Sequence, residues 1–157
     1  MASHENKKVT VQQQVLDQSN RSSWLSQALR DMGSSLMLED NPLSKLPYIQ
    51  KLAREKYFRR FSPAGFALRE ALTQCIDELS EELATEPGQA RESRFLLLRP
   101  KGFNVTQIAE ELGISRSYCS STIQKRAIKI LLAKFTATVS EERTRKNPRT
   151  KDHIDLT

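Results

Sequence analysis

The stretch VTQIAEELGISRSYCSSTIQKRAIKILLAKF, residues 105–135, decides the fold of this chain. Its apolar residues recur at intervals of three and four, which is the spacing of the buried face of an α-helix. The pattern breaks at Gly113 and resumes at Ser115. Glycine readily adopts the left-handed backbone that ends a helix, and serine is a preferred cap for the next helix. We therefore expect two helices joined by a tight turn.

The two expected helices have the parts of a helix-turn-helix. Thr106 is expected to cap the first helix, whose inner side carries Ile108, Ala109 and Leu112. Ile114 is expected to fill the angle between the helices. The inward side of the second helix is apolar and consists of Cys119, Ile123, Ala127, Ile130 and Leu131. A glycine turn with a small residue at the crossing is typical of a helix-turn-helix, and an unrelated helical hairpin is the alternative.

The outward side of the second helix suits contact with phosphates, because residues 115–135 contain no Asp or Glu. The candidates for contact with double-stranded DNA are polar or basic and are expected to face outward: Arg116, Ser117, Ser120, Ser121, Gln124, Lys125 and Lys129. Two further candidates, Thr106 and Gln107, belong to the first helix.

Several stretches resemble the C-terminal, promoter-reading domain of sigma-70-type bacterial sigma factors, especially the sporulation type. They are LGISRSYCS at residues 112–120, QKRAIKIL at 124–131, LREAL at 68–72, and RESRFLLLR with KGF within 91–103. LuxR-type regulators share the last of these stretches. The resemblance covers residues 64–135 and implies a domain that places its second helix in the major groove.

The chain departs from the sigma pattern in three ways. The loop at residues 84–90 is longer than the usual turn, and the stretch 120–124 holds one extra residue, which shifts the later basic residues around the helix. Serine stands at three positions where sigma factors often carry longer polar side chains: Ser117, Ser120 and Ser121. Serine discriminates poorly between bases. The resemblance therefore implies base reading mainly by Arg116, Gln124 and Lys125, a backbone grip by Thr106 and Gln107, and some reading of DNA shape.

The rest of the chain is also predicted to be helical, so the expected fold class is all-α. Residues 9–40 show an amphipathic pattern broken near residues 19–20 and at Gly33. Further helices are expected at residues 43–61, 64–83 and 91–99. The expected organisation is an N-terminal helical extension at 1–42 (its first eight residues disordered), a basic helix at 43–63, the helix-turn-helix domain at 64–135, and a polar tail at 136–157.

Charge is strongly segregated along the chain. Residues 43–63 hold six Lys/Arg against one Glu, and residues 91–135 hold nine against three acids. Between them, residues 64–90 hold one Arg against six acids. This pattern indicates an electropositive face, although solvated helix surfaces would give the same pattern. The acidic group Asp77, Glu78, Glu81 and Glu82 could bind a basic partner or be a solvated face.

The N-terminal apolar stripe has two interpretations. Helix-turn-helix regulators commonly bind DNA as dimers, so the stripe could form a homodimer interface, or it could cover the chain's own core. Its members are Leu25, Leu29, Met32 and Leu36. The aromatic residues of this half are expected in a core or an interface, not in promoter melting: Trp24, Tyr48, Tyr57, Phe58 and Phe61.

An enzyme is not expected. The only histidines, His4 and His153, lie near the chain ends, and no nucleophile triad, glycine-rich phosphate loop, metal site or cofactor site is recognisable. Cys75 and Cys119 are expected to be buried, reduced thiols. With no apolar run near the roughly 20 residues of a membrane span and no signal peptide, we expect a cytoplasmic protein that associates with the nucleoid through DNA.

These observations favour a sequence-specific regulator of transcription that binds double-stranded DNA. The first 63 residues hold no recognisable polymerase-binding and promoter-melting region, so an autonomous initiation factor is not expected. The alternative is an adaptor that binds RNA polymerase and has weak DNA affinity. A third possibility comes from chromosome-partition and transposition proteins, which use similar turns.

Overall fold

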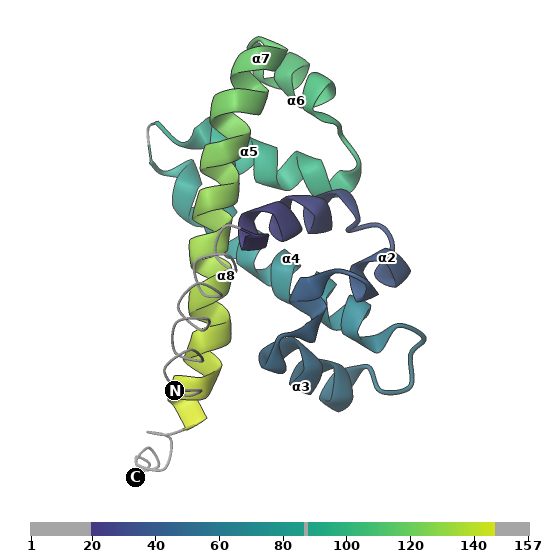
Figure 1. Ribbon diagram of the computed structural model, residues 1–157. Coiled ribbons are helices and arrows are strands. Elements are labelled where there is room, and N and C mark those ends of the chain that lie inside the picture. Colours follow the sequence, from purple (N-terminus) through teal and green to yellow (C-terminus); the bar gives the residue numbers. More distant parts are fainter. Residues whose placement is uncertain (1–19, 87, 147–157) are drawn as a thin grey trace, which may run out of the picture.

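The computed structural model describes residues 20–86 and 88–146, and all regular elements in them are helical (Figure 1). This confirms the all-α prediction. After a helix over residues 20–30 come α2 (Ser35–Glu39), the 3-10 turn η1 (Pro42–Lys45), α3 (Pro47–Lys56), α4 (Pro63–Ala84), α5 (Ala90–Leu98), the 3-10 turn η2 (Arg99–Lys101), α6 (Val105–Leu112), α7 (Arg116–Tyr118), the π-helical turn η3 (Cys119–Ile123) and α8 (Gln124–Lys146).

Helix α4 is the centre of the fold and contacts α2, α3, α5 and α8. Its apolar stripe, predicted from the spacing of Leu68, Leu72 and Ile76, is buried along its whole length. Gly65 lets α2 approach very closely, because a Cβ atom at this position would lie 1.9 Å from the carbonyl oxygen of Ser35. The Gly65 N–H donates to Oε1 of Glu39 at 2.8 Å, which fixes this contact.

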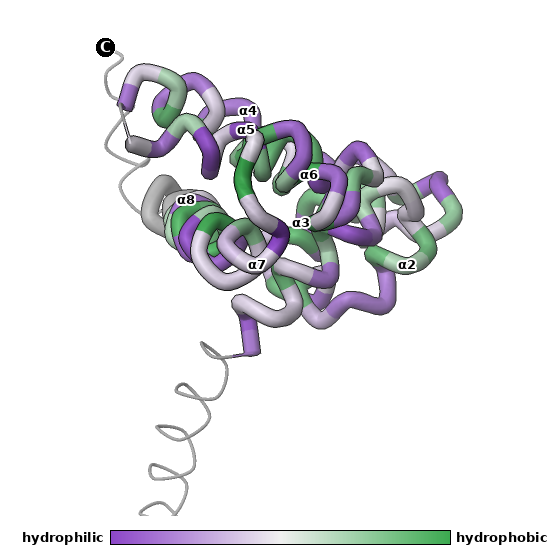
Figure 2. The backbone as a smooth tube through the Cα atoms, turned by 90° about the horizontal axis from the view of Figure 1, so that it is seen from above, coloured by the Kyte–Doolittle hydropathy of each residue, from purple (hydrophilic) through white to green (hydrophobic). Residues whose placement is uncertain are grey.

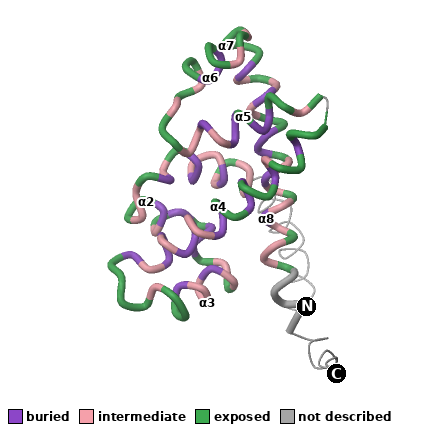
Figure 3. Tube along the Cα trace, turned by 180° about the vertical axis from the view of Figure 1, so that it is seen from behind, coloured by how far each residue is buried: buried purple, intermediate pink, exposed green. Residues whose placement is uncertain are grey.

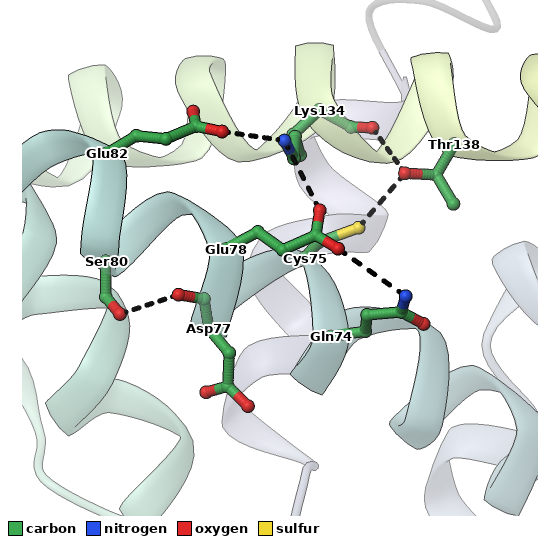
Figure 4. A network of polar contacts seen from close by, with 8 residues as sticks. All are labelled: Gln74, Cys75, Asp77, Glu78, Ser80, Glu82, Lys134 and Thr138. Carbon is green, nitrogen blue, oxygen red and sulfur yellow. Dashed lines mark hydrogen bonds and ion pairs between the residues drawn. The ribbon is translucent and has the colours of Figure 1, made fainter.

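Helix α8 is tied to α4 by polar contacts as well as by apolar packing (Figure 4). Lys134 Nζ lies 3.0 Å from Glu82 Oε2 and 3.3 Å from Glu78 Oε1, and the hydrogen bond to Glu82 is the main cause of the raised pKa of Lys134. All four members of the acidic group are exposed, and two of them, Glu78 and Glu82, form ion pairs within the chain.

The N-terminal apolar stripe covers the chain's own core. Leu25, Leu29 and Met32 are buried in the same hydrophobic cluster as the side chains of α4, so for these three residues the second of the two interpretations is the one the structure supports. Leu36 differs, because 57% of its surface is exposed. The predicted break at Gly33 is confirmed, since the chain turns at residues 31–33.

Two helix boundaries differ from the sequence-based prediction. The basic helix expected at 43–61 is interrupted before Pro47, because Leu46 takes the extended conformation that a following proline favours, and α3 then ends at Lys56. Helix α8 continues to Lys146 although a polar tail was expected from residue 136. Phe135 is buried and Val139 packs against the core, so the apolar seam of the helix extends further than predicted. The predictions for residues 1–19 and 147–157 lie outside the described residues.

Both cysteines are buried and free, as predicted, and burial raises the pKa of each thiol. In the part of the chain that the structure describes, no helix has the length and apolar character needed to cross a membrane.

We predict that Leu29→Ala lowers the free energy of unfolding by about 2–5 kcal/mol, because it leaves a cavity in the core. The matched control is Leu36→Ala, which removes an exposed leucine and should change stability by less than about 0.5 kcal/mol. Urea unfolding measures both changes. The intramolecular packing of Leu29 would be contradicted if both variants changed the free energy of unfolding by the same small amount and Leu29→Ala eluted as a smaller oligomer in size-exclusion chromatography.

Candidate nucleic-acid interface

A capping box starts helix α6. The Asn104 side chain accepts a hydrogen bond from the Gln107 N–H at 2.8 Å, and the Gln107 side chain accepts one from the Asn104 N–H at 2.9 Å. The predicted cap, Thr106, was therefore wrong, and it lies exposed on the first turn. The sequence signal was the spacing of Asn104 and Gln107, which matches the capping-box pattern. The amide nitrogen of Gln107 is still able to donate to a phosphate.

The turn between the two helices has the predicted construction. Gly113 is left-handed, with φ of 69°, and the Ile114 N–H bonds back to the Ala109 carbonyl at 3.0 Å. Ser115 caps the next helix by accepting from the Tyr118 N–H at 3.0 Å. Ile114 is half-buried and packs against the core. These contacts fix the direction in which α7 leaves α6.

The second helix is one rod over residues 116–146 that contains the π-helical turn η3. Its buried seam repeats every four residues and consists of Cys119, Ile123, Ala127, Leu131 and Phe135. In an ideal α-helix of 3.6 residues per turn, such a seam would rotate by about 40° at each step. In a π-turn each hydrogen bond joins residues five apart, so one turn holds more residues than a turn of α-helix. The π-turn therefore reverses part of the rotation of the seam. The stretch expected to hold one extra residue, 120–124, overlaps this turn.

Arg116 and Thr106 meet across the turn, although they belong to different helices. The Arg116 Nε donates to the Thr106 Oγ1 at 2.9 Å, and both residues are exposed. Ser117 and Ser121 are also exposed, and Ser120 is half-buried. Figure 2 looks down on this end of the molecule, where the serine-rich trace at α7 is pale, meaning of intermediate hydropathy.

Two residues that the sequence did not single out contribute to the same end. The guanidinium of Arg91, on α5, lies 5.9 Å from the centre of the Tyr118 ring, and both side chains are exposed. This pair places a cation of α5 beside the aromatic ring of α7. Tyr118 was visible within the motif, but its contact with Arg91 depends on how α5 packs, which local spacing does not reveal.

The other three residues predicted to contact DNA line a groove beside the helix over residues 20–30. Gln124, Lys125 and Lys129 line this groove of about 930 Å³, together with Arg21 and three serines of the N-terminal helix. The floor is apolar and includes Ile128 and Leu132 of α8. The helix over residues 20–30 therefore lies opposite these three candidates, a neighbour that the sequence analysis did not anticipate.

Three exposed cations of the α6–α7 end and the groove have no acidic partner among the described residues. Among the described residues, no carboxylate lies within ion-pair distance of Arg116, Lys125 or Lys129. Arg126 differs, because its Nη1 lies 3.7 Å from Oε2 of Glu92, which is buried in α5 and whose Oε1 has no hydrogen-bond partner. Arg126 thus links α8 to α5, and the other three cations can face a polyanion.

No family model, curated protein or solved structure matches this chain. In the described part of the chain, no group of three or more His, Cys, Asp or Glu residues could hold a metal ion. The functional argument therefore depends on the residues of the α6–α7 end and of the groove.

We predict that Gly113→Ala lowers the free energy of unfolding by roughly 1–2 kcal/mol, because a side chain disfavours the left-handed backbone. Gly33→Ala is the matched control. A Cβ at either position meets no atom within 4 Å, but only Gly113 has a positive φ. The control should therefore be neutral or slightly stabilising. Thermal or urea unfolding separates the two, and equal stabilities of the two variants would contradict the turn.

Proposed function

We propose that this chain is a sequence-specific regulator of transcription that binds double-stranded DNA and has no catalytic role. The observation that carries the proposal is the exposed α6–α7 end, where Arg116 is held against Thr106 and meets no carboxylate among the described residues. In this proposal, α7 and the π-turn enter the major groove. The resemblance to the promoter-reading domain of sigma factors supports the same orientation.

The residues of the α6–α7 end have distinct proposed roles. Arg116 is the base reader, since arginine can form two hydrogen bonds to a guanine edge. Thr106 and Gln107 contact the phosphate backbone at the start of α6, where the partial positive charge of the helix favours an anion. Ser117 and Ser121 fit closely against the DNA but discriminate little, so DNA shape supplies part of the specificity.

The groove residues contribute at longer range. Gln124, Lys125 and Lys129 lie further along the rod, and Arg21 adds a fourth polar or basic side chain from the facing helix. We propose that these side chains attract the phosphate backbone beside the major groove, which strengthens binding to any sequence. A protein with this arrangement would associate with the nucleoid through DNA.

An adaptor that binds RNA polymerase is the second candidate. The observation that favours it is the serine-rich recognition surface, which offers few long side chains for reading bases. Assembly as a homodimer through Leu36, which is the exposed member of the N-terminal stripe, is a further possibility that size-exclusion chromatography can test.

We predict that Arg116→Ala combined with Lys125→Ala weakens binding to a selected DNA duplex by about tenfold or more, because the base contact of Arg116 contributes roughly 1–3 kcal/mol and Lys125 adds a phosphate contact. Both side chains are exposed, so the unfolding free energy should fall by no more than about 1 kcal/mol, for the lost Arg116–Thr106 hydrogen bond. Fluorescence anisotropy at several salt concentrations measures affinity and the number of phosphates contacted, which the double variant should reduce.

The matched control is Arg30→Ala with Lys45→Ala, which removes two exposed cations from the end of the helix over residues 20–30 and from η1. Its duplex affinity should stay within about twofold of wild type, apart from a small long-range electrostatic effect. Equal losses in the two double variants would show that only net charge matters. Capture of RNA polymerase by a chain that binds no duplex would replace the proposal with the adaptor function.

A further inference from the structure

The loop over residues 57–62 presents two phenylalanine rings to solvent. Phe58 is 65% exposed and Phe61 is 82% exposed, the two highest values among the large apolar residues described. Figure 3 shows this loop, beyond the end of α3, as an exposed segment. Isolated exposed apolar residues are common, but two such rings in one short loop indicate a surface that binds something.

The loop is held in place by its other aromatic residue. The Tyr57 hydroxyl donates to Glu70 of α4, whose second oxygen lies 2.9 Å from Lys56 Nζ. The Tyr57 ring also stacks on Phe66, with centroids 5.7 Å apart and an interplanar angle of 20°. Since these contacts fix the base of the loop, the outward direction of Phe58 and Phe61 is set by the fold.

Backbone and cation contacts restrict the loop further. Ser62 ends the loop with φ of 62°, the only positive φ at a non-glycine residue in the described chain. A serine in this conformation persists only where the surrounding structure imposes it. Arg60 lies 5.0 Å over the Phe66 ring, on the side of the loop that faces α4. The backbone that carries the two exposed rings is therefore held in place before a partner binds.

The loop is also strongly basic. The guanidinium of Arg59 lies 5.3 Å over the Phe58 ring, and Arg54, Arg59 and Arg60 are all exposed. The one acid within residues 54–61 is Glu55, which lies 4.0 Å from Lys51. Aromatic rings beside cations match a partner that has flat, stackable faces and a negative backbone.

We propose that residues 54–61 form a second binding site, which holds single-stranded DNA by stacking unpaired bases on Phe58 and Phe61. A duplex fits this site poorly because its base faces are covered by neighbouring pairs. An anionic membrane fits poorly because Ile49 and Ala53 of α3 are buried, which leaves no wide apolar face to insert.

This site lies at the opposite end of the molecule from α6 and α7, as Figures 1 and 3 show. The chain could therefore hold a duplex at one end and an unpaired segment of the same DNA at the other. The choice of DNA over RNA rests on the proposed function, whereas stacking and charge are common to both nucleic acids.

The test measures binding of a 20-nucleotide thymidine oligomer by fluorescence anisotropy at moderate salt. Phe58→Ala with Phe61→Ala should weaken binding at least tenfold, because stacking on each ring is lost. Phe58→Trp with Phe61→Trp should restore it, since tryptophan also stacks. The control is Met37→Ala, which removes an exposed apolar side chain elsewhere and should leave binding unchanged.

Three further measurements separate the outcomes. Duplex affinity should stay within twofold in the double phenylalanine variant, so a failure of this site and a failure of the duplex proposal are distinguishable. Equal binding of the oligomer by wild type and this variant would overturn the proposal. The proposal would also be overturned if a uridine RNA oligomer bound tenfold more tightly than the thymidine oligomer. A third contradicting result would be that the double phenylalanine variant loses binding only to vesicles that contain phosphatidylserine.

Discussion

The arrangement of this molecule depends on burying one apolar seam of the rod over residues 116–146. Five residues spaced by four, from Cys119 to Phe135, are buried, those of the π-turn near α5 and α6 and those of α8 near α4 and α5. A regular α-helix would turn such a seam gradually toward solvent. The π-helical turn at Cys119–Ile123 offsets this rotation over the first step of the seam, at the end of the rod that leads from α7 (Figure 1).

The position of α7 follows from this seam and from the capped turn before it. Gly113 and Ser115 set the angle between α6 and the rod, and the Arg116–Thr106 hydrogen bond joins the two helices at their exposed ends. The acids of α4 bind Lys134, further along the rod, and leave the α7 end free of their charge. The α6–α7 end itself holds the acids Glu110 and Glu111 beside the cation Arg116. The proposed contact with DNA therefore depends on Arg116 and on the cations of neighbouring helices, Arg91 of α5 and Lys125 and Lys129 of α8.

The sequence predicted local features well because their signals lie within a few residues. Residues that are close along the chain determine three of these features, which are the left-handed Gly113, the Ser115 cap and the apolar stripe of α4. The cap at Asn104 was also present as a local pattern but was assigned to Thr106. The close approach of α2 at Gly65, the wall that Arg21 forms beside Lys125, and the contact of Arg91 with Tyr118 depend on tertiary packing. Spacing within one segment does not contain that information.

The central claim is that α7 and the π-turn enter the major groove of a specific duplex. The most direct test selects bound fragments from a random duplex pool and then maps methylation interference on the enriched sequence. We expect one enriched sequence in which methylation of guanine N7, in the major groove, blocks binding, with the effect reduced by Arg116→Ala. An unenriched pool, or interference only at adenine N3 in the minor groove, would contradict the account.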